Sequence, residues 1–202
     1  MGAFCTLVFE RPDLGYDNRW DRMNVNAAIE LIRTLFKESC VELFESMDCN
    51  VQPAVFEDLE KSYIPAAYID AGSDDFELLL TLRLPLAALT MTYPIQEHIV
   101  SIDESELEDW FLEIANRLLG LLKAKLTSRD CKINTGLPSH DFGEDKAQSI
   151  NQCEYAPSFY TLDDEAVEMG ITLETIKETI AIEENVKEDD SNAQAGDLDF
   201  FF

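Results

Sequence analysis

Apolar residues recur along this chain with a helical period in some segments and a strand period in others. The first helical segment spans residues 24–48, where apolar side chains follow the three- and four-residue spacing of an amphipathic helix. Its stripe consists of Ile29, Ile32, Leu35, Phe36, Leu43 and Phe44. Asn24 or Asn26 is suited to cap such a helix. We therefore predict a long helix that ends at about Asp48.

Three segments after this helix have the pattern of strands. Residues 51–59 and 62–70 contain Pro53 and Pro65, and proline is tolerated at a sheet edge or at the start of a strand. Residues 76–84 are apolar enough for a central strand. These segments predict a sheet with its middle near residue 80.

Proline also marks a short helix after these strands. Pro85 suits the start of a helix over residues 86–93, and Pro94 ends it, because proline fits a first helical turn but not a helix interior. The polar residues 70–75 form the turn that precedes the central strand.

The second long helical stripe begins at Leu107 and is the most strongly patterned part of the chain. It continues with Trp110, Phe111, Ile114, Leu118, Leu121 and Leu122. Residues 101–104, Ser-Ile-Asp-Glu, offer a capping box that sets the start of this helix. Acidic residues cluster there: Asp103, Glu104, Glu106, Glu108 and Asp109. A metal site is one interpretation, but favourable charge at a helix start explains the cluster better.

The opposite face of this helix carries Glu113, Asn116 and Gly120. At about 100° per residue, Glu113 and Asn116 lie about 60° apart, so their side chains point together into solvent. Gly120 costs roughly 1 kcal/mol relative to alanine in a helix interior. Its presence indicates that something approaches the backbone closely there, either a partner or another element of the same chain.

The C-terminal half predicts further strands. Residues 131–136 have the pattern of a strand, and residues 139–150 are polar enough for a loop. Residues 152–161 and 166–174 pair as a final hairpin, unless the second segment instead joins a helix through Ile182. Periodicity alone does not separate these two readings.

Length and charge limit the classes of function. A chain of 202 residues with 46% hydrophobic content buries the core of one domain with a tail. The formal charge of −26, from 41 acidic and 15 basic residues, argues against nucleic acid and anionic membranes as partners. A basic or locally basic protein partner fits this charge.

Cysteine and histidine offer no independent catalytic set. The five cysteines show no C-x-x-C spacing and read as reduced, mostly buried thiols of a cytoplasmic protein: Cys5, Cys40, Cys49, Cys131 and Cys153. The only histidines, His98 and His140, have no nucleophile or metal-ligand pattern around them. A Gly-rich phosphate loop is also missing.

The chain ends in an acidic linker that carries three aromatic residues. From Glu183 the composition becomes acidic and small, and the last residues are Phe200, Phe201 and Phe202. Exposed aromatic side chains are costly, so this end is expected to dock on a surface. It docks either into a groove of its own domain or onto a partner, as a tethered peptide that raises the partner's local concentration.

The pattern Glu113-x-x-Asn116-x-x-x-Gly120-x-x-Lys123-x-x-Leu126, followed by Gly136-Leu137-Pro138, resembles the active-site helix and following strand of the chemotaxis phosphatases of the CheC and CheX family. The helix that begins Met23-Asn24-Val25-Asn26-Ala27-Ala28-Ile29 is similar to the first helix of the CheX type, which has no such motif of its own. The resemblance covers roughly residues 23–140. This sequence departs from the family at residues 68–76, which replace a Gly-rich hairpin. Beyond residue 140 it shows no match to the closing strands of the family.

The resemblance implies a CheC/CheX-like α+β domain, in which two long helices pack on a mixed or antiparallel sheet. It places this domain at residues 23–182, after an N-terminal extension of residues 1–22 and before an acidic tail of residues 183–202. A homodimer is compatible with it, although the departure at residues 68–76 leaves a strand-swapped dimer open.

The family hydrolyses the acyl phosphate of a phosphorylated response regulator such as CheY. By this resemblance, Asn116 orients the attacking water and Glu113 pairs with a lysine of the regulator. Other expected partner contacts are Gly120, Arg117, Asp109, Phe200, Phe201 and Phe202. The chain needs no cofactor or metal of its own, because the receiver domain of the regulator brings Mg²⁺.

Two other classes stay open. In the first, the same helix belongs to a non-catalytic module that only binds a receiver domain. Alternatively, the chain is an adaptor in which the tail is the functional part, and Glu113 and Asn116 are ordinary surface residues. The phosphatase reading requires both side chains to be exposed side by side.

Overall fold

The computed structural model describes residues 22–55, 64–94, 102–142 and 155–186. The helices in these ranges are α1 (Val25–Glu45), α2 (Leu86–Thr92) and α3 (Glu104–Thr127). The strands are β1 (Arg22–Asn24), β2 (Val51–Ala54), β3 (Ala66–Gly72), β4 (Phe76–Arg83), β5 (Asn134–Thr135), β6 (Ser139–Asp141), β7 (Tyr155–Leu162), β8 (Glu165–Thr175) and β9 (Thr179–Ala181).

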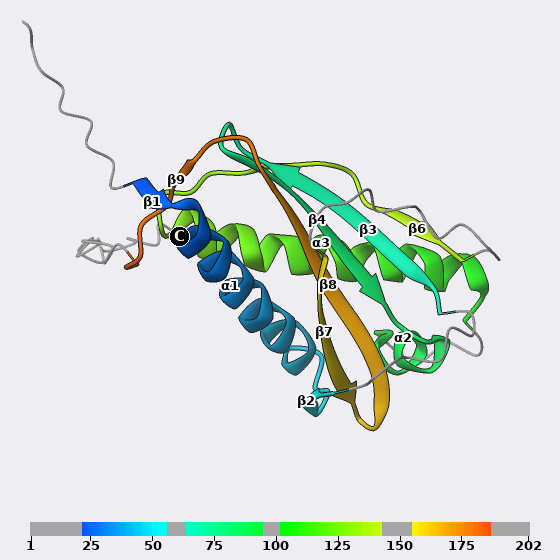
Figure 1. Cartoon of the computed structure of the whole chain (residues 1–202). Coiled ribbons are helices and arrows are strands. Elements are labelled where there is room, and N and C mark those ends of the chain that lie inside the picture. The colour runs from blue at the N-terminus through cyan, green and yellow to red at the C-terminus, as the bar shows by residue number, and fades with distance from the viewer. Residues whose placement is uncertain (1–21, 56–63, 95–101, 143–154, 187–202) are drawn as a thin grey trace, which may run out of the picture.

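These strands form a large and a small sheet (Figure 1), and within the described residues all strand pairings are antiparallel. The order in the large sheet is β2-β7-β8-β4-β3-β5, and β6 also pairs with β3. The small sheet joins β1 to β9 and so brings together the two ends of the described chain. The predicted α+β fold with an antiparallel sheet is therefore confirmed.

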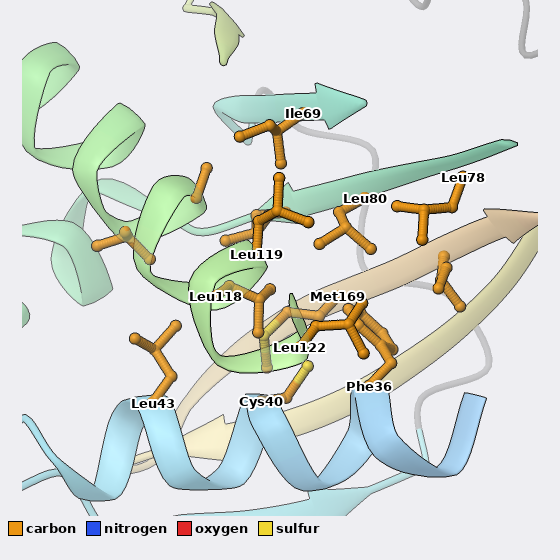
Figure 2. Close-up of a cluster of buried hydrophobic side chains, with 14 of the residues drawn as sticks. Phe36, Cys40, Leu43, Ile69, Leu78, Leu80, Leu118, Leu119, Leu122 and Met169 are labelled. Atoms are coloured by element: carbon orange, nitrogen blue, oxygen red, sulfur yellow. The ribbon is translucent and has the colours of Figure 1, made fainter. Parts of the chain in front are cut away.

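The long helices α1 and α3 pack on each other and cover one face of the large sheet. Alternate residues of β4 are buried on this face: Phe76, Leu78, Leu80 and Leu82. Figure 2 shows Phe36 and Cys40 of α1 and Leu118 of α3 pointing toward Leu80 and Met169 of the sheet. All five side chains are fully buried. The core therefore lies between two amphipathic helices and the apolar face of the sheet.

Elements with strong local signals agree with the sequence. Helix α1 begins after Asn24, whose side chain accepts a hydrogen bond from the backbone N–H of Asn26 at 3.0 Å. The short helix α2 follows Pro85 and ends before Pro94. Strand β4 is central, between β3 and β8. Pro53 lies in the edge strand β2, as expected.

Other boundaries differ from the prediction. Strand β2 ends at Ala54, and the rest of the segment predicted to Leu59 lies mostly outside the described residues. Strand β3 continues to Gly72, so the turn before β4 is shorter than residues 70–75. Within residues 131–136, only Asn134–Thr135 form a strand, β5.

The predicted loop over residues 139–150 is wrong for its first three residues, which form β6. Tyr68 of β3 pairs with Ser139, and Ala66 pairs with Asp141. An edge strand has one neighbour and an exposed side, so polar residues are compatible with it. Phe142 has no regular secondary structure, as predicted, and residues 143–150 lie outside the described ranges.

The hairpin of β7 and β8 is confirmed, and the alternative of a helix through Ile182 is wrong. Strand β8 pairs with β7 on one side and with β4 on the other. Its residues Val167, Met169 and Ile171 are buried at every second position, because successive side chains of a strand point to opposite faces of the sheet. The chain then continues into β9 rather than into a helix.

A close approach between β3 and the segment after β5 explains Gly136. Its backbone N–H donates to the Asp70 carbonyl oxygen at 2.8 Å. A Cβ at this position would overlap the Asp70 carboxylate, so glycine allows the two segments to meet here. Within the described residues, no helix is long and apolar enough to cross a membrane.

Candidate functional site

A capping box fixes the start of α3, the helix that carries the candidate site. The Asp103 side chain accepts from the backbone N–H of Glu106 at 2.9 Å, and the Glu106 side chain accepts from the backbone N–H of Asp103 at 2.9 Å. The capping box therefore spans residues 103–106, two residues later than the predicted box over residues 101–104. The acidic cluster is partly used in this cap, which supports its interpretation as a helix start.

The buried stripe of α3 then fixes which side faces solvent. Its buried members are Trp110, Phe111, Ile114, Ala115, Leu118, Leu119, Leu122 and Leu126. Leu107 and Leu121, which were also predicted in the stripe, are half-buried at its margin. On the α1 side, the Lys125 Nζ lies 2.8 Å from a carboxylate oxygen of Glu42. The helix is thus held in one rotation, with its opposite face free.

Glu113 and Asn116 are both exposed on this opposite face, as predicted. The carboxamide of Asn116 makes no hydrogen bond to any residue in the described ranges. Its oxygen and its amide hydrogens are therefore available to water or to a partner. The functional roles of Glu113 and Asn116 stay predictions.

Gly120 lies one turn beyond Asn116 and is exposed. Apart from its chain neighbours and the backbone of α3 itself, no atom of the described residues lies within 4 Å of the place that a Cβ would take there. The alternative that Gly120 packs against another element is therefore wrong for the described part of the chain. The helix accepts the cost of glycine at an open position, where a partner's surface can come close to the backbone.

Glu113 is held by an ion pair within the helix. The Arg117 Nε donates to its Oε1 at 2.8 Å, and both side chains are about half exposed, at 48% and 47%. The guanidinium carbon of Arg117 also lies 5.0 Å from the centre of the Trp110 ring. Sequence spacing could have found the ion pair, because Glu and Arg four residues apart meet on a helix.

For the other residues of the predicted site, the structure gives exposure on α3 or no description at all. Asp109 is exposed, one turn before Glu113 on the same helix. Lys123 is exposed one turn beyond Gly120. Phe200, Phe201 and Phe202 lie outside the described residues.

The remaining reactive groups make no competing centre among the described residues. Cys40, Cys49 and Cys131 are buried free thiols, and burial raises the pKa of each, which disfavours the reactive thiolate. His140 Nε2 lies 3.9 Å from a Glu108 carboxylate oxygen, and its ring packs edge-on against Phe142. No described group of three or more His, Cys, Asp or Glu side chains is arranged to hold a metal ion. The histidine His98 is outside the described residues.

Comparison with known proteins gives matches among solved structures only. No protein-family model and no curated protein matches the sequence. The chemotaxis protein CheX from Desulfovibrio desulfuricans matches with a TM-score of 0.57 and 14% identity, over 71% of this chain and 99% of that chain. A CheC-like superfamily protein from Shewanella matches with a TM-score of 0.56 and 16% identity, over 75% of this chain and 99% of that chain.

A third similar structure is the complex of CheX with CheY, BeF₃ and Mg²⁺ from Borrelia burgdorferi. It matches with a TM-score of 0.54 and 12% identity, over 69% of this chain and 96% of that chain. At these identities, the likeness shows the fold. This chain therefore has the fold of the CheX and CheC-like chemotaxis proteins.

Proposed function

We propose that this chain, which has the CheX and CheC-like fold, is a phosphatase of that family and hydrolyses the aspartyl phosphate of a CheY-like receiver domain. One observation carries the proposal. Glu113 and Asn116 are exposed side by side on a helix whose rotation the core fixes, and the Asn116 carboxamide has no partner in the described chain. The exposed pair and the CheX and CheC-like fold together support the proposal.

Asn116 would act by positioning water. Its carboxamide accepts a hydrogen bond from the water without removing its proton, and it carries no charge that must be desolvated when it enters the receiver. The water oxygen forms a bond to phosphorus as the bond to the aspartate oxygen breaks. The products are inorganic phosphate and the free carboxylate.

The remaining chemistry belongs to the receiver. The aspartyl phosphate and its Mg²⁺ are on the partner, so this chain supplies no metal ligand under the proposal. A rate gain of about 10²–10³ needs about 3–4 kcal/mol of barrier lowering, which positioning of one water is able to supply.

Glu113 would bind a lysine of the receiver. An exposed carboxylate suits a compact ammonium ion, and the pairing places Asn116 next to the phosphate. The CheX–CheY structure from Borrelia burgdorferi supports a CheY-like receiver as the class of partner. A cytoplasmic location and a role in chemotaxis are part of the same proposal.

The test is the dephosphorylation of a panel of phosphorylated receiver domains by wild-type protein and by Asn116→Ala. We expect one receiver to lose phosphate faster with the wild type. Asn116→Ala should lower this accelerated rate of dephosphorylation by about 10²-fold. Binding to that receiver, measured by calorimetry, should persist because Glu113 remains. Asn26→Ala, an exposed asparagine on α1, is the matched control and should keep full activity.

Two results contradict the proposal. Binding without faster dephosphorylation would make the chain a non-catalytic receiver-binding module. Neither binding nor acceleration would remove the receiver as a partner and direct attention to the acidic tail.

A further inference from the structure

Arg117 is held between two groups on α3 rather than extended into solvent. Its Nε donates to Glu113 Oε1 at 2.8 Å, and its guanidinium carbon lies 5.0 Å from the Trp110 ring centre. A guanidinium is suited to both contacts at once, because its positive charge is attracted to the face of the ring while its N–H groups donate at its edge. Arg117 thus connects the site carboxylate to a buried aromatic residue.

Trp110 is itself fixed by α2 and the residue that follows it. The ring is buried, with 7% of the residue exposed, and its Nε1 donates to Thr92 Oγ1 at 3.2 Å. Tyr93 packs edge-on against it, with ring centres 5.9 Å apart. Thr92 is also buried, and its hydroxyl bonds to the backbone of α2. The surface on which Arg117 rests therefore has one orientation.

The contact leaves half of the Glu113 carboxylate open. Only Arg117 Nε reaches it, through Oε1, and Oε2 makes no bond within the described part of the chain. A glutamate on a solvated helix face otherwise samples several rotamers, and binding has to select one of them. With Oε1 occupied, the side chain presents Oε2 outward in a restricted direction.

We infer that Arg117 is a positioning residue that orients Glu113 for an incoming ammonium group. This inference rests on the proposed function, because the ammonium is a lysine of the receiver. In the complex, Glu113 would lie between two cations, with Arg117 on Oε1 and the lysine on Oε2. The opposite reading, in which Arg117 competes with the lysine and masks Glu113, predicts the reverse effect of its removal.

The test is a double-mutant cycle on the receiver that responds to the wild-type protein. We expect Arg117→Ala to raise KM about 5-fold and to leave kcat unchanged, because it acts on binding through Glu113. In the Glu113→Gln background, Arg117→Ala should have no further effect. Arg117→Lys should resemble Arg117→Ala, since lysine keeps the charge but has neither the Nε–H nor the flat face. Lys37→Ala, which removes one exposed positive charge from α1, is the matched control and should keep the wild-type KM.

Three results of the cycle overturn the inference. Additive losses in the double variant would mean that Arg117 contacts the receiver directly. A lower KM for Arg117→Ala would mean that it masks Glu113. Full rescue by Arg117→Lys would mean that only its charge matters.

A second measurement needs no receiver and separates this inference from the proposed function. In the NMR spectrum of the protein alone, the Arg117 Nε–H signal should be displaced by the Trp110 ring current and should move when Glu113 is changed to Gln. If that signal is insensitive to Glu113→Gln, Arg117 does not hold Glu113, whatever the phosphatase assay shows. If it moves while no receiver is dephosphorylated, the proposed function fails and the contact stands.

Discussion

Asp75 joins three segments that are far apart in the sequence. Its Oδ1 accepts from Arg22 Nη2 at 2.8 Å and from Lys177 Nζ at 2.6 Å, and its Oδ2 accepts from the Ala181 backbone N–H at 2.8 Å. Burial raises the pKa of this carboxyl, but the bonds from Lys177, Ala181 and Arg22 outweigh it and lower the pKa to about 2. One side chain therefore fastens β1 and β9 to the turn before β4.

Stability should depend on the charge of Asp75 at low pH. Since its folded-state pKa of about 2 is below the ordinary value of 3.8, the stabilisation is complete above about pH 4 and is lost as the pH falls toward 2. Asp75→Asn should lower the free energy of unfolding by about 2 kcal/mol at neutral pH. Urea denaturation at several pH values measures this loss, which should shrink toward pH 2.

The neighbouring Asp74 provides the control for this measurement. It is exposed and makes no bond within the described residues, so Asp74→Asn should leave the urea midpoint nearly unchanged. Equal effects of the two substitutions would show that general charge, rather than the contacts of Asp75, determines stability here.

The orientation of α3 depends on how this helix begins. Its capping box satisfies N–H groups at the first turn, and Glu104 and Glu106 add favourable charge there. Because the helix crosses the core and carries the candidate site, fraying of its first turns would loosen Trp110 and the contacts that depend on it. The cap and the site are thus linked through one element.

Asp103→Ala should lower the melting temperature by about 2–4 °C, because it removes the acceptor for the Glu106 N–H. Circular dichroism during a thermal scan measures the shift. Glu104→Ala is the comparison, since Glu104 is a first-turn acid without a capping bond, and its effect should be smaller. A larger loss with Glu104→Ala would mean that charge alone stabilises this end.

The net charge acts on the molecule as a whole. A formal charge of −26 in 202 residues places acidic side chains close together on the surface, and their repulsion opposes the compact state. Favourable pairs such as Lys125 with Glu42 offset only a part of it. Repulsion between exposed charges is screened over a Debye length of about 10 Å at 0.1 M salt.

The melting temperature should therefore rise as NaCl is added from about 0.01 M to 0.5 M, because the Debye length falls over this range. Differential scanning calorimetry follows the change. A sucrose series at low salt controls for general solvent effects. The melting temperature in that series should lack the steep initial rise that is expected when NaCl is first added. A fall of the melting temperature with NaCl would mean that specific ion pairs, above all those at Asp75, outweigh the repulsion.

The elements with local signals could be predicted from the order of the amino acids alone. Asn24 and the apolar stripe after it predicted α1, and Pro85 and Pro94 bracketed α2, because caps, proline geometry and helical period act within a few residues. The same period placed Glu113 and Asn116 together on the exposed face of α3. These features need no knowledge of distant partners.

Which segments meet depends on the packing of the whole domain. Residues 139–141 look like a loop until β3 offers an edge for pairing, and the segment after β8 becomes β9 because β1 lies beside it. Thr92 supports Trp110 across 18 residues, and Asp75 meets Ala181 across 106 residues. Such contacts depend on how whole elements pack, and no local period or cap encodes a packing partner that is distant along the chain.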